Sequence, residues 1–107
     1  MPTTESSGTQ SASIGSEHSL ATVAAARVLI LTVDAANMAN GDVLELRVKT
    51  RVLTGGTNRL AYMASYANVQ AEPIKISIPV VSMFNCEFTL KQTAGTGRNY
   101  DWSVVST

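Results

Sequence analysis

The sequence predicts an all-β fold, an antiparallel β-sandwich or jelly roll, that follows a flexible N-terminal arm. From Ser19 onward, apolar and polar residues alternate with a period of two, the spacing that separates the two faces of a strand. Clusters of Gly, Asn, Asp and Pro recur about every ten residues and indicate turns between roughly six or seven strands. No segment keeps the period of a helix longer than one turn. The 107 residues are enough for one domain.

The first segment, residues 1–17, is predicted to be the flexible arm. It consists mainly of Ser, Thr, Gly, Gln and Glu and has almost no apolar content. Such a segment cannot offset the entropy of ordering by burying apolar surface. We expect it to be plainly disordered or to become ordered only against a partner. Residues 18–107 are expected to form the sandwich domain.

The middle of the chain contains the clearest strand signals. Residues 28–33 are apolar on both faces, which predicts a central strand covered on both sides. In residues 34–42, Asp34 is suited to capping a single helical turn and Gly41 to ending it. Residues 43–53 predict a half-buried strand, because an apolar face alternates with a charged one. The inward residues are Leu44, Leu46, Val48, Thr50 and Val52, and the outward residues are Glu45, Arg47, Lys49 and Arg51.

The remaining strands follow the same alternation. Residues 54–58 predict a hairpin connection to a strand over residues 59–69. Pro79 indicates an edge strand or a bulge in the strand that follows the turn at residues 70–73. The predicted inward residues are Leu60, Tyr62, Ala64 and Tyr66, then Ile74, Ile76, Ile78 and Val80, then Cys86, Phe88 and Leu90, and finally Trp102, Val104 and Ser106.

Charge and composition favour a binding protein and disfavour several partners. Eight basic and eight acidic residues cancel without forming a basic stripe, so we expect no nucleic-acid partner. The longest apolar stretch, residues 24–33, contains Arg27 and is too short to span a membrane, and residues 1–5 do not resemble a secretion signal. Charged residues make up 15% of the chain, against about 25% in typical globular proteins. Such a surface suits a protein covered by its own copies or by a larger body, although a merely polar surface is the alternative.

No residue pattern predicts an enzyme, a metal site or a cofactor. His18 is the only histidine, and no Gly-x-Ser-x-Gly sequence marks a nucleophile. Cys86 alternates with phenylalanines and is expected to be a buried, inert thiol. Asn37, Asn40 and Asp42 share one loop but lack the spacing of a calcium-binding loop, so capping is the favoured interpretation. We therefore expect the chain not to be an enzyme.

Three stretches resemble small virion proteins of tailed bacteriophages. They are residues 17–22, residues 37–47, and residues 70–73 taken together with residues 89–98 and Trp102. Small β-sandwich members of such phage structural modules often decorate the head as cement proteins. The resemblance implies that this chain binds the outside of an assembled shell at junctions between major capsid protein subunits, as a trimer or dimer. It would be made in the cytoplasm of the host bacterium and reside on the capsid surface of the virion.

The implied contacts fall on the arm, on one strand face and on two aromatic residues. The alternative is a receptor- or glycan-binding module of a phage tail or head fibre, with Tyr100 and Trp102 as a stacking surface. Arg47, Lys49 and Arg51 are candidates to meet acidic capsid patches, the alternative being a solvated strand face. The full set of candidate contact residues is Thr3, Thr4, Ser13, Ile14, His18, Arg47, Lys49, Arg51, Tyr100 and Trp102.

Overall fold

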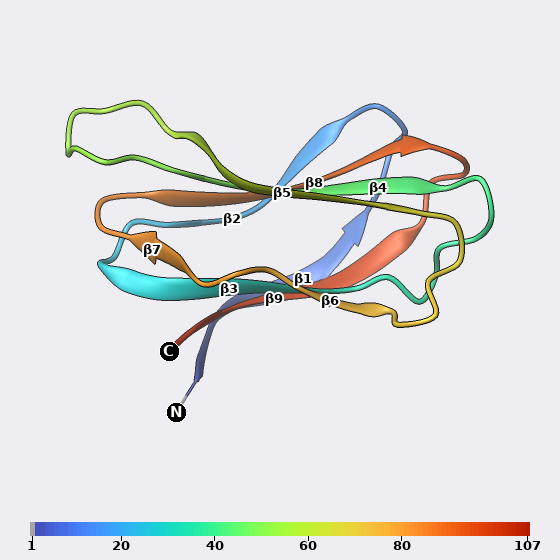
Figure 1. Cartoon of the computed structure of the whole chain (residues 1–107), viewed down its shortest axis with the longest axis horizontal. Coiled ribbons are helices and arrows are strands. Elements are labelled where there is room, and N and C mark those ends of the chain that lie inside the picture. Colours follow the sequence, from blue (N-terminus) through green and yellow to red (C-terminus); the bar gives the residue numbers. More distant parts are fainter. Residues whose placement is uncertain (1) are drawn as a thin grey trace.

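The computed structural model describes residues 2–107 and confirms the predicted all-β sandwich: two antiparallel sheets pack face to face, and the described residues form no helix (Figure 1). No membrane-spanning helix therefore occurs in residues 2–107. The strands are β1 (Thr3–Ser11), β2 (Glu17–Val23), β3 (Arg27–Asp34), β4 (Val43–Thr50), β5 (Arg59–Ala67), β6 (Ile74–Ile76), β7 (Val80–Ser82), β8 (Cys86–Ala94) and β9 (Asn99–Ser106).

The two sheets divide the strands almost equally. Sheet A has the order β1-β9-β3-β6, and β7 pairs with the other half of β3. Sheet B has the order β2-β8-β4-β5. In Figure 1 sheet B lies above sheet A, and the strands of both run across the picture. All pairings are antiparallel. Because successive side chains of a strand point to opposite faces of its sheet, alternate residues face the space between the sheets.

That space is filled by aliphatic and aromatic side chains from the central strands. β3 and β4 supply the alternating residues that the sequence predicts to face inward, and β8 and β9 close the core around them. The hydrophobic residues with no more than 2% of their surface exposed are Leu29, Leu31, Val33, Leu44, Leu46, Val48, Cys86, Phe88, Leu90, Tyr100 and Val104, together with Ala35. Burial of this set is the main favourable contribution to folding.

The prediction of a flexible N-terminal arm is wrong for the residues that the structure describes. Thr3–Ser11 forms β1 and pairs with β9 along its whole length, with a bulge between Thr4 and Ser6. The strand forms despite its polar side chains because its backbone completes the hydrogen bonding of β9. Gly8 lies against the indole of Trp102, and a Cβ added there would stand 3.4 Å from that ring, an ordinary contact distance. Met1, the first residue of the predicted arm, lies outside the described residues.

Three smaller predictions along the middle strands also need correction. β3 is central, but only its Leu29 face is buried, and Ile30 on the other face is half-exposed. The predicted helical turn after Asp34 is replaced by two tight turns, the second of which has Gly41 at a φ of 97°. β4 ends at Thr50, so Val52 stands 87% exposed in the following loop.

The predicted hairpin between β4 and β5 is confirmed, but a bulge changes one side chain of β5. Tyr62 lies opposite Val48, whereas Leu60 lies opposite Lys49, so Ala61 is an extra residue. A one-residue insertion moves the preceding side chain to the other face of the sheet. Leu60 is therefore 53% exposed rather than inward.

The predicted inward stripe after Pro73 is wrong for three of its four residues. Ile74, Ile76 and Ile78 are 53%, 62% and 55% exposed, and only Val80 is buried. The reason is Ser77, which is itself buried: its hydroxyl accepts the Leu31 N–H at 2.9 Å and its own N–H donates to the Leu31 carbonyl at 2.8 Å. With Ser77 facing inward, the isoleucines on either side of it face outward.

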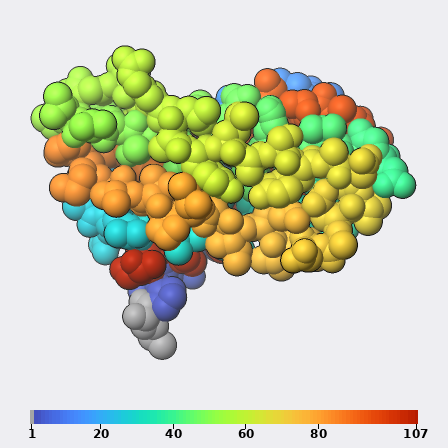
Figure 2. Space-filling view, viewed as in Figure 1, coloured from blue at the N-terminus to red at the C-terminus, as the bar shows by residue number. Residues whose placement is uncertain are grey.

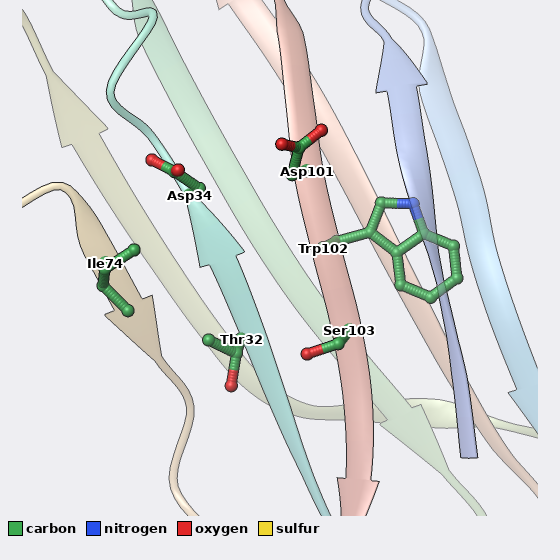
Figure 3. Close-up of a pocket in the computed structure, with 6 residues that line it drawn as sticks. All are labelled: Thr32, Asp34, Ile74, Asp101, Trp102 and Ser103. Carbon is green, nitrogen blue, oxygen red and sulfur yellow. The ribbon is translucent and has the colours of Figure 1, made fainter. Parts of the chain in front are cut away.

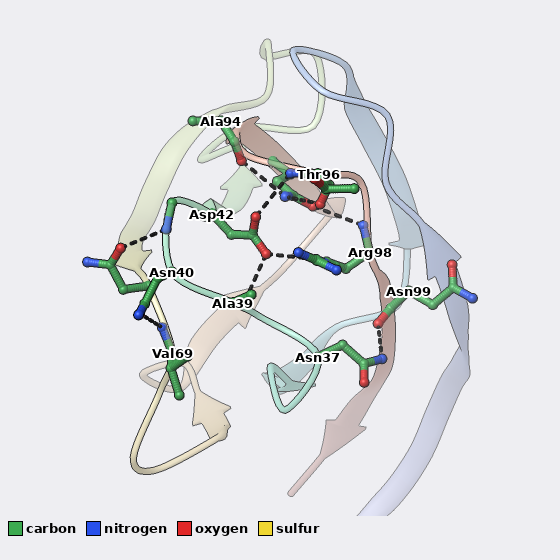
Figure 4. Close-up of polar contacts among 12 residues, drawn as sticks. Asn37, Ala39, Asn40, Asp42, Val69, Ala94, Thr96, Arg98 and Asn99 are labelled. Atoms are coloured by element: carbon green, nitrogen blue, oxygen red, sulfur yellow. Dashed lines mark hydrogen bonds and ion pairs between the residues drawn. The ribbon is translucent and has the colours of Figure 1, made fainter.

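The turn between β8 and β9 is fastened to the loop before β4 by a buried carboxylate (Figure 4). Asp42 accepts hydrogen bonds from the N–H groups of Ala39 and Thr96 and from Nε of Arg98, at 2.9, 3.0 and 2.9 Å. Gly95 packs directly on Asp42 with a φ of 90°, and a Cβ there would overlap the carboxylate. The turn therefore requires glycine for both its backbone conformation and its close approach.

We predict that Gly95→Ala lowers the free energy of unfolding by about 3 kcal/mol, because it adds backbone strain and displaces a buried, hydrogen-bonded charge. Chemical denaturation monitored by circular dichroism measures the loss. The matched control is Gly55→Ala, where no atom lies within 4 Å of an added Cβ; its effect should stay within about 0.5 kcal/mol. A loss of less than about 1 kcal/mol for Gly95→Ala would contradict this account of the turn.

Candidate functional site

The polar clusters described below connect turns, loops and strands of the fold. Residues 2–107 contain no group of three or more His, Cys, Asp or Glu side chains arranged to hold a metal ion. His18 uses Nε2 to accept the N–H of Ser13 at 3.1 Å, which braces the turn between β1 and β2. Cys86 is fully buried, and burial raises the pKa of its thiol to about 11, so the thiol stays protonated near neutral pH.

The loop that carries Asn37, Asn40 and Asp42 is braced by its own side chains. Burial acts to raise the pKa of Asp42, but the three donors around its carboxylate outweigh burial and lower the pKa. Asn37 donates to the Asn99 carbonyl at 2.7 Å, and Asn40 accepts the Val69 N–H at 3.4 Å (Figure 4). These contacts join neighbouring loops, in agreement with the preferred interpretation as caps and braces.

The basic row on β4 is neutralised within sheet B. The Glu17 carboxylate, on β2, binds Lys49 Nζ at 2.8 Å, Arg47 Nη1 at 3.1 Å and the Thr89 hydroxyl at 2.7 Å. The hydrogen bonds from Lys49 and Thr89 lower the pKa of Glu17. Arg51 donates from Nε to the side chain of Asn58 at 2.8 Å. Arg47 and Lys49 are thus paired with carboxylates, whereas Arg51, in the loop after β4, contacts the neutral side chain of Asn58 and keeps its charge.

The structure does not gather the ten predicted contact residues into one surface. Thr3 and Thr4 lie on β1 of sheet A, Ser13 and the 44% exposed Ile14 lie in the turn before β2, and the basic residues lie on sheet B. Tyr100 is fully buried and donates its hydroxyl to Gln92 at 3.0 Å. Trp102 is half-buried beneath Gly8. A stacking platform of Tyr100 and Trp102 is therefore wrong.

The feature that stands out is an aliphatic surface on the outside of sheet A. Ile74 lies opposite Asp34, Ile76 opposite Thr32, and Val81 opposite Val28. Because Asp34, Thr32 and Val28 point away from the core, Ile74, Ile76 and Val81 lie on the outer face of sheet A. Ile78 follows the inward Ser77 and also faces outward, with more than half of its surface exposed. We call the following set the aliphatic face: Ile74, Ile76, Ile78 and Val81 at the edge, and the half-buried Val28, Ile30 and Val105 beside them.

The chain segment that supplies the edge of the aliphatic face also supplies most of the other exposed hydrophobic residues. Eleven of the twelve exposed large hydrophobic residues within residues 2–107 lie between Val52 and Phe84, and the twelfth is Ile14. The same segment has only three charged residues, namely Arg59, Glu72 and Lys75. In Figure 2 this segment, coloured green to orange, covers most of the side turned toward the reader. Single exposed hydrophobic residues are ordinary, but a contiguous group marks an interaction surface.

One end of the aliphatic face is acidic. Asp34 and Asp101 lie directly opposite each other on β3 and β9, and with Thr32, Ile74 and Ser103 they line an open depression of about 210 Å³ (Figure 3). Like charges facing each other across a strand pair destabilise a sheet. Each carboxylate has one compensating contact, from the Ala36 N–H to Asp34 and from the Thr9 hydroxyl to Asp101.

Comparison with known proteins gives no relative: no protein-family model, no curated protein and no solved structure matches this chain.

The aliphatic face is the candidate that the sequence analysis missed. The signal lay in residues 74–80, where Lys75 and Ser77 alternate with the isoleucines. Lys75 turns toward the other sheet, with its Nζ 4.8 Å from the centre of the Tyr66 ring.

We predict that stability falls as pH drops below about 4.5, because Glu17 and Asp42 have lowered pKa values in the folded protein. The stabilisation by each carboxylate is complete above its unfolded pKa and is lost as pH falls through the folded pKa. Glu17→Gln should flatten this dependence, measured as the change in unfolding free energy between pH 7 and pH 3. The control, Glu72→Gln on an exposed side chain, should keep the wild-type slope. Equal slopes for wild type and Glu17→Gln would contradict the role of the Glu17 cluster.

Proposed function

We propose that this chain is a phage capsid accessory protein of the decoration or cement type, which attaches to the assembled head through the aliphatic face. The observation that carries the proposal is that this face is exposed, contiguous and almost free of charge. The resemblance of residues 17–22, 37–47 and 89–98 to small phage virion proteins supports the choice of partner. The partner would be the major capsid protein.

The shape of the face supports a protein partner over a small ligand. Small-molecule sites are concave and bury most of their ligand. The aliphatic face instead lies on the outside of sheet A, and the depression at its end is open. An extended apolar surface with a polar rim is the usual centre of a protein–protein interface. Burial of this face against a second protein would remove it from water and favour attachment.

The acidic end of the face defines the chemistry of the partner further. Asp34 and Asp101 repel each other across the β3–β9 pair. A partner surface that places an arginine or lysine beside an apolar centre would relieve this repulsion while covering Ile74 and Ile76. Such a charge pair would add more to the specificity and rate of docking than to affinity.

The effect on the shell would follow from mass action. A ligand that binds only the assembled shell stabilises it in proportion to RT ln(1 + [L]/Kd). Many equivalent sites on a symmetric lattice would add avidity if one molecule or oligomer touches more than one subunit. No catalytic step is needed for this role. The glycan-binding alternative has lost its main support, because Tyr100 is buried and Trp102 is covered by β1.

The proposal predicts that the protein sediments with shells of its phage that were assembled without it, in a fixed ratio to the major capsid protein. Ile76→Lys should weaken this attachment by about a hundredfold, since it places a charge in the centre of the apolar contact. Ile76 is 62% exposed, so the substitution should leave the fold intact.

Ile14→Lys is the matched control, because within residues 2–107 Ile14 is the one exposed large hydrophobic residue outside the 52–84 segment. It should attach like the wild type. Absence of co-sedimentation at micromolar concentration, or equal attachment of the Ile76→Lys variant, would overturn the proposal.

A further inference from the structure

Sheet B ends in an edge strand whose protective features, a bulge and one charge, both lie near its start. β5 has nine residues, Arg59–Ala67, and within residues 2–107 it pairs only with β4. Its only charged residue is Arg59 at its first position, and it contains neither proline nor glycine. A long, nearly uncharged edge strand is a template for pairing with another strand.

The other edges of the sandwich carry the features that prevent such pairing. β1 has a bulge and the acidic Glu5, and β2 has a bulge and begins with Glu17. β6 and β7 have three residues each, and Pro79 separates them. Short strands, bulges, charges and proline all disfavour edge pairing. β5 has a bulge too, at Ala61, but beyond it residues 62–67 are regular and uncharged and include two tyrosines and Met63, whereas the regular part of β1, residues 6–11, is polar and contains Gly8. Among the edges of the described residues, this combination is found in β5 alone.

The hydrogen bonds show which groups of β5 are free. The Asn68 N–H donates to the Asp42 carbonyl at 2.8 Å, and the register continues from this pair to Leu44 opposite Tyr66 and Leu46 opposite Ala64. In an antiparallel ladder, hydrogen-bonded pairs alternate with non-hydrogen-bonded pairs. Tyr66 and Ala64 thus bind β4, whereas Met63, Ser65 and Ala67 direct their N–H and carbonyl groups away from it.

We propose that β5 pairs with β5 of a second copy of this chain, antiparallel about a two-fold axis, and so joins two B sheets into one of eight strands. With Ala64 on the axis, Met63 of each copy exchanges hydrogen bonds with Ser65 of the other. The same register sets Tyr62 opposite Tyr66 of the other copy, and cross-strand aromatic pairs stabilise sheets.

A second copy fits this edge because the strand is compatible with itself. In the proposed register, the two Arg59 residues lie at opposite ends of the paired ribbon, about 30 Å apart, so that their repulsion is screened. The side of the molecule that carries β5 spans its two longer dimensions, 41 Å and 30 Å (Figure 2). The nine-residue edge is much narrower than this side, so adjoining parts of the side would contribute to any interface that reaches the standard size of roughly 800 Å² per partner.

The inference goes beyond the proposed function and does not require it. Pairing through β5 leaves the outer surface of sheet A uncovered, and it would bring two aliphatic faces to the same side of one dimer. Loss of the dimer and loss of shell attachment are then separate outcomes, since they arise from substitutions on different strands.

The test is the mass of the full chain in solution, measured by sedimentation equilibrium over a range of concentrations. The wild type should have twice the mass of one chain. Ser65→Pro removes one free N–H per copy without touching the β4 ladder, so the dimer dissociation constant should rise roughly a hundredfold. Ser65→Thr keeps the N–H and should dimerise like the wild type.

Circular dichroism establishes that each variant is folded, and Ser65→Lys provides a second disruption if the proline variant is not. Ile76→Lys should leave the dimer intact, which separates this test from that of the proposed function. A wild type that is monomeric at millimolar concentration, or trimeric, would overturn the inference. A dimer that persists in both Ser65→Pro and Ser65→Lys would overturn it as well.

Discussion

The contact between Ser77 and Leu31 sets the face that the protein presents to its surroundings. β3 pairs with β6 at one end and with β7 at the other, and between these two strands the Leu31 N–H and carbonyl need partners. Ser77 provides both, and it must face the core to do so. The isoleucines on either side are consequently turned outward. Two buried hydrogen bonds thus fix which side of a short edge segment meets water, and hydrophobicity alone would favour the opposite arrangement.

The rest of the surface offers less for a partner to recognise. Glu17 and Glu45 pair with Arg47 and Lys49, Asp42 binds Arg98, and Glu5 lies 3.4 Å from Arg27, so much of the charge is used within the molecule. Different segments of the chain also form the core and the exposed surfaces. The core comes mainly from β3, β4, β8 and β9, whereas the segment between Val52 and Phe84 contributes the free edge of β5 and the exposed part of the aliphatic face. Both proposed contact surfaces therefore draw on one segment of the chain, although one is an edge of sheet B and the other lies on the outside of sheet A.

The sequence predicted β4 and β8 well, because their alternation can be satisfied by only one buried face, but it predicted β3 to be covered on both faces, where only the Leu29 face is buried. The prediction failed where the alternating pattern does not determine which set of residues faces the core. Residues 74–78 alternate isoleucine with Lys75 and Ser77, and either set can face inward until the partners of Leu31 are known. β1 was missed because its stability comes from backbone pairing with β9, which composition does not reveal. The Ala61 bulge and the exposed Val52 depend on where the β4–β5 pairing ends, and no local signal marks that point.

The most direct test of the account is the solvent exposure of the five isoleucine methyl groups, measured by NMR with a soluble paramagnetic probe. The account predicts strong broadening for Ile74, Ile76 and Ile78, comparable with the exposed Ile14 and greater than that of the half-buried Ile30. Addition of shells should protect the first three and leave Ile14 unchanged. If Ile74, Ile76 and Ile78 were shielded in the free protein, Ser77 would not face the core, and the aliphatic face would not exist.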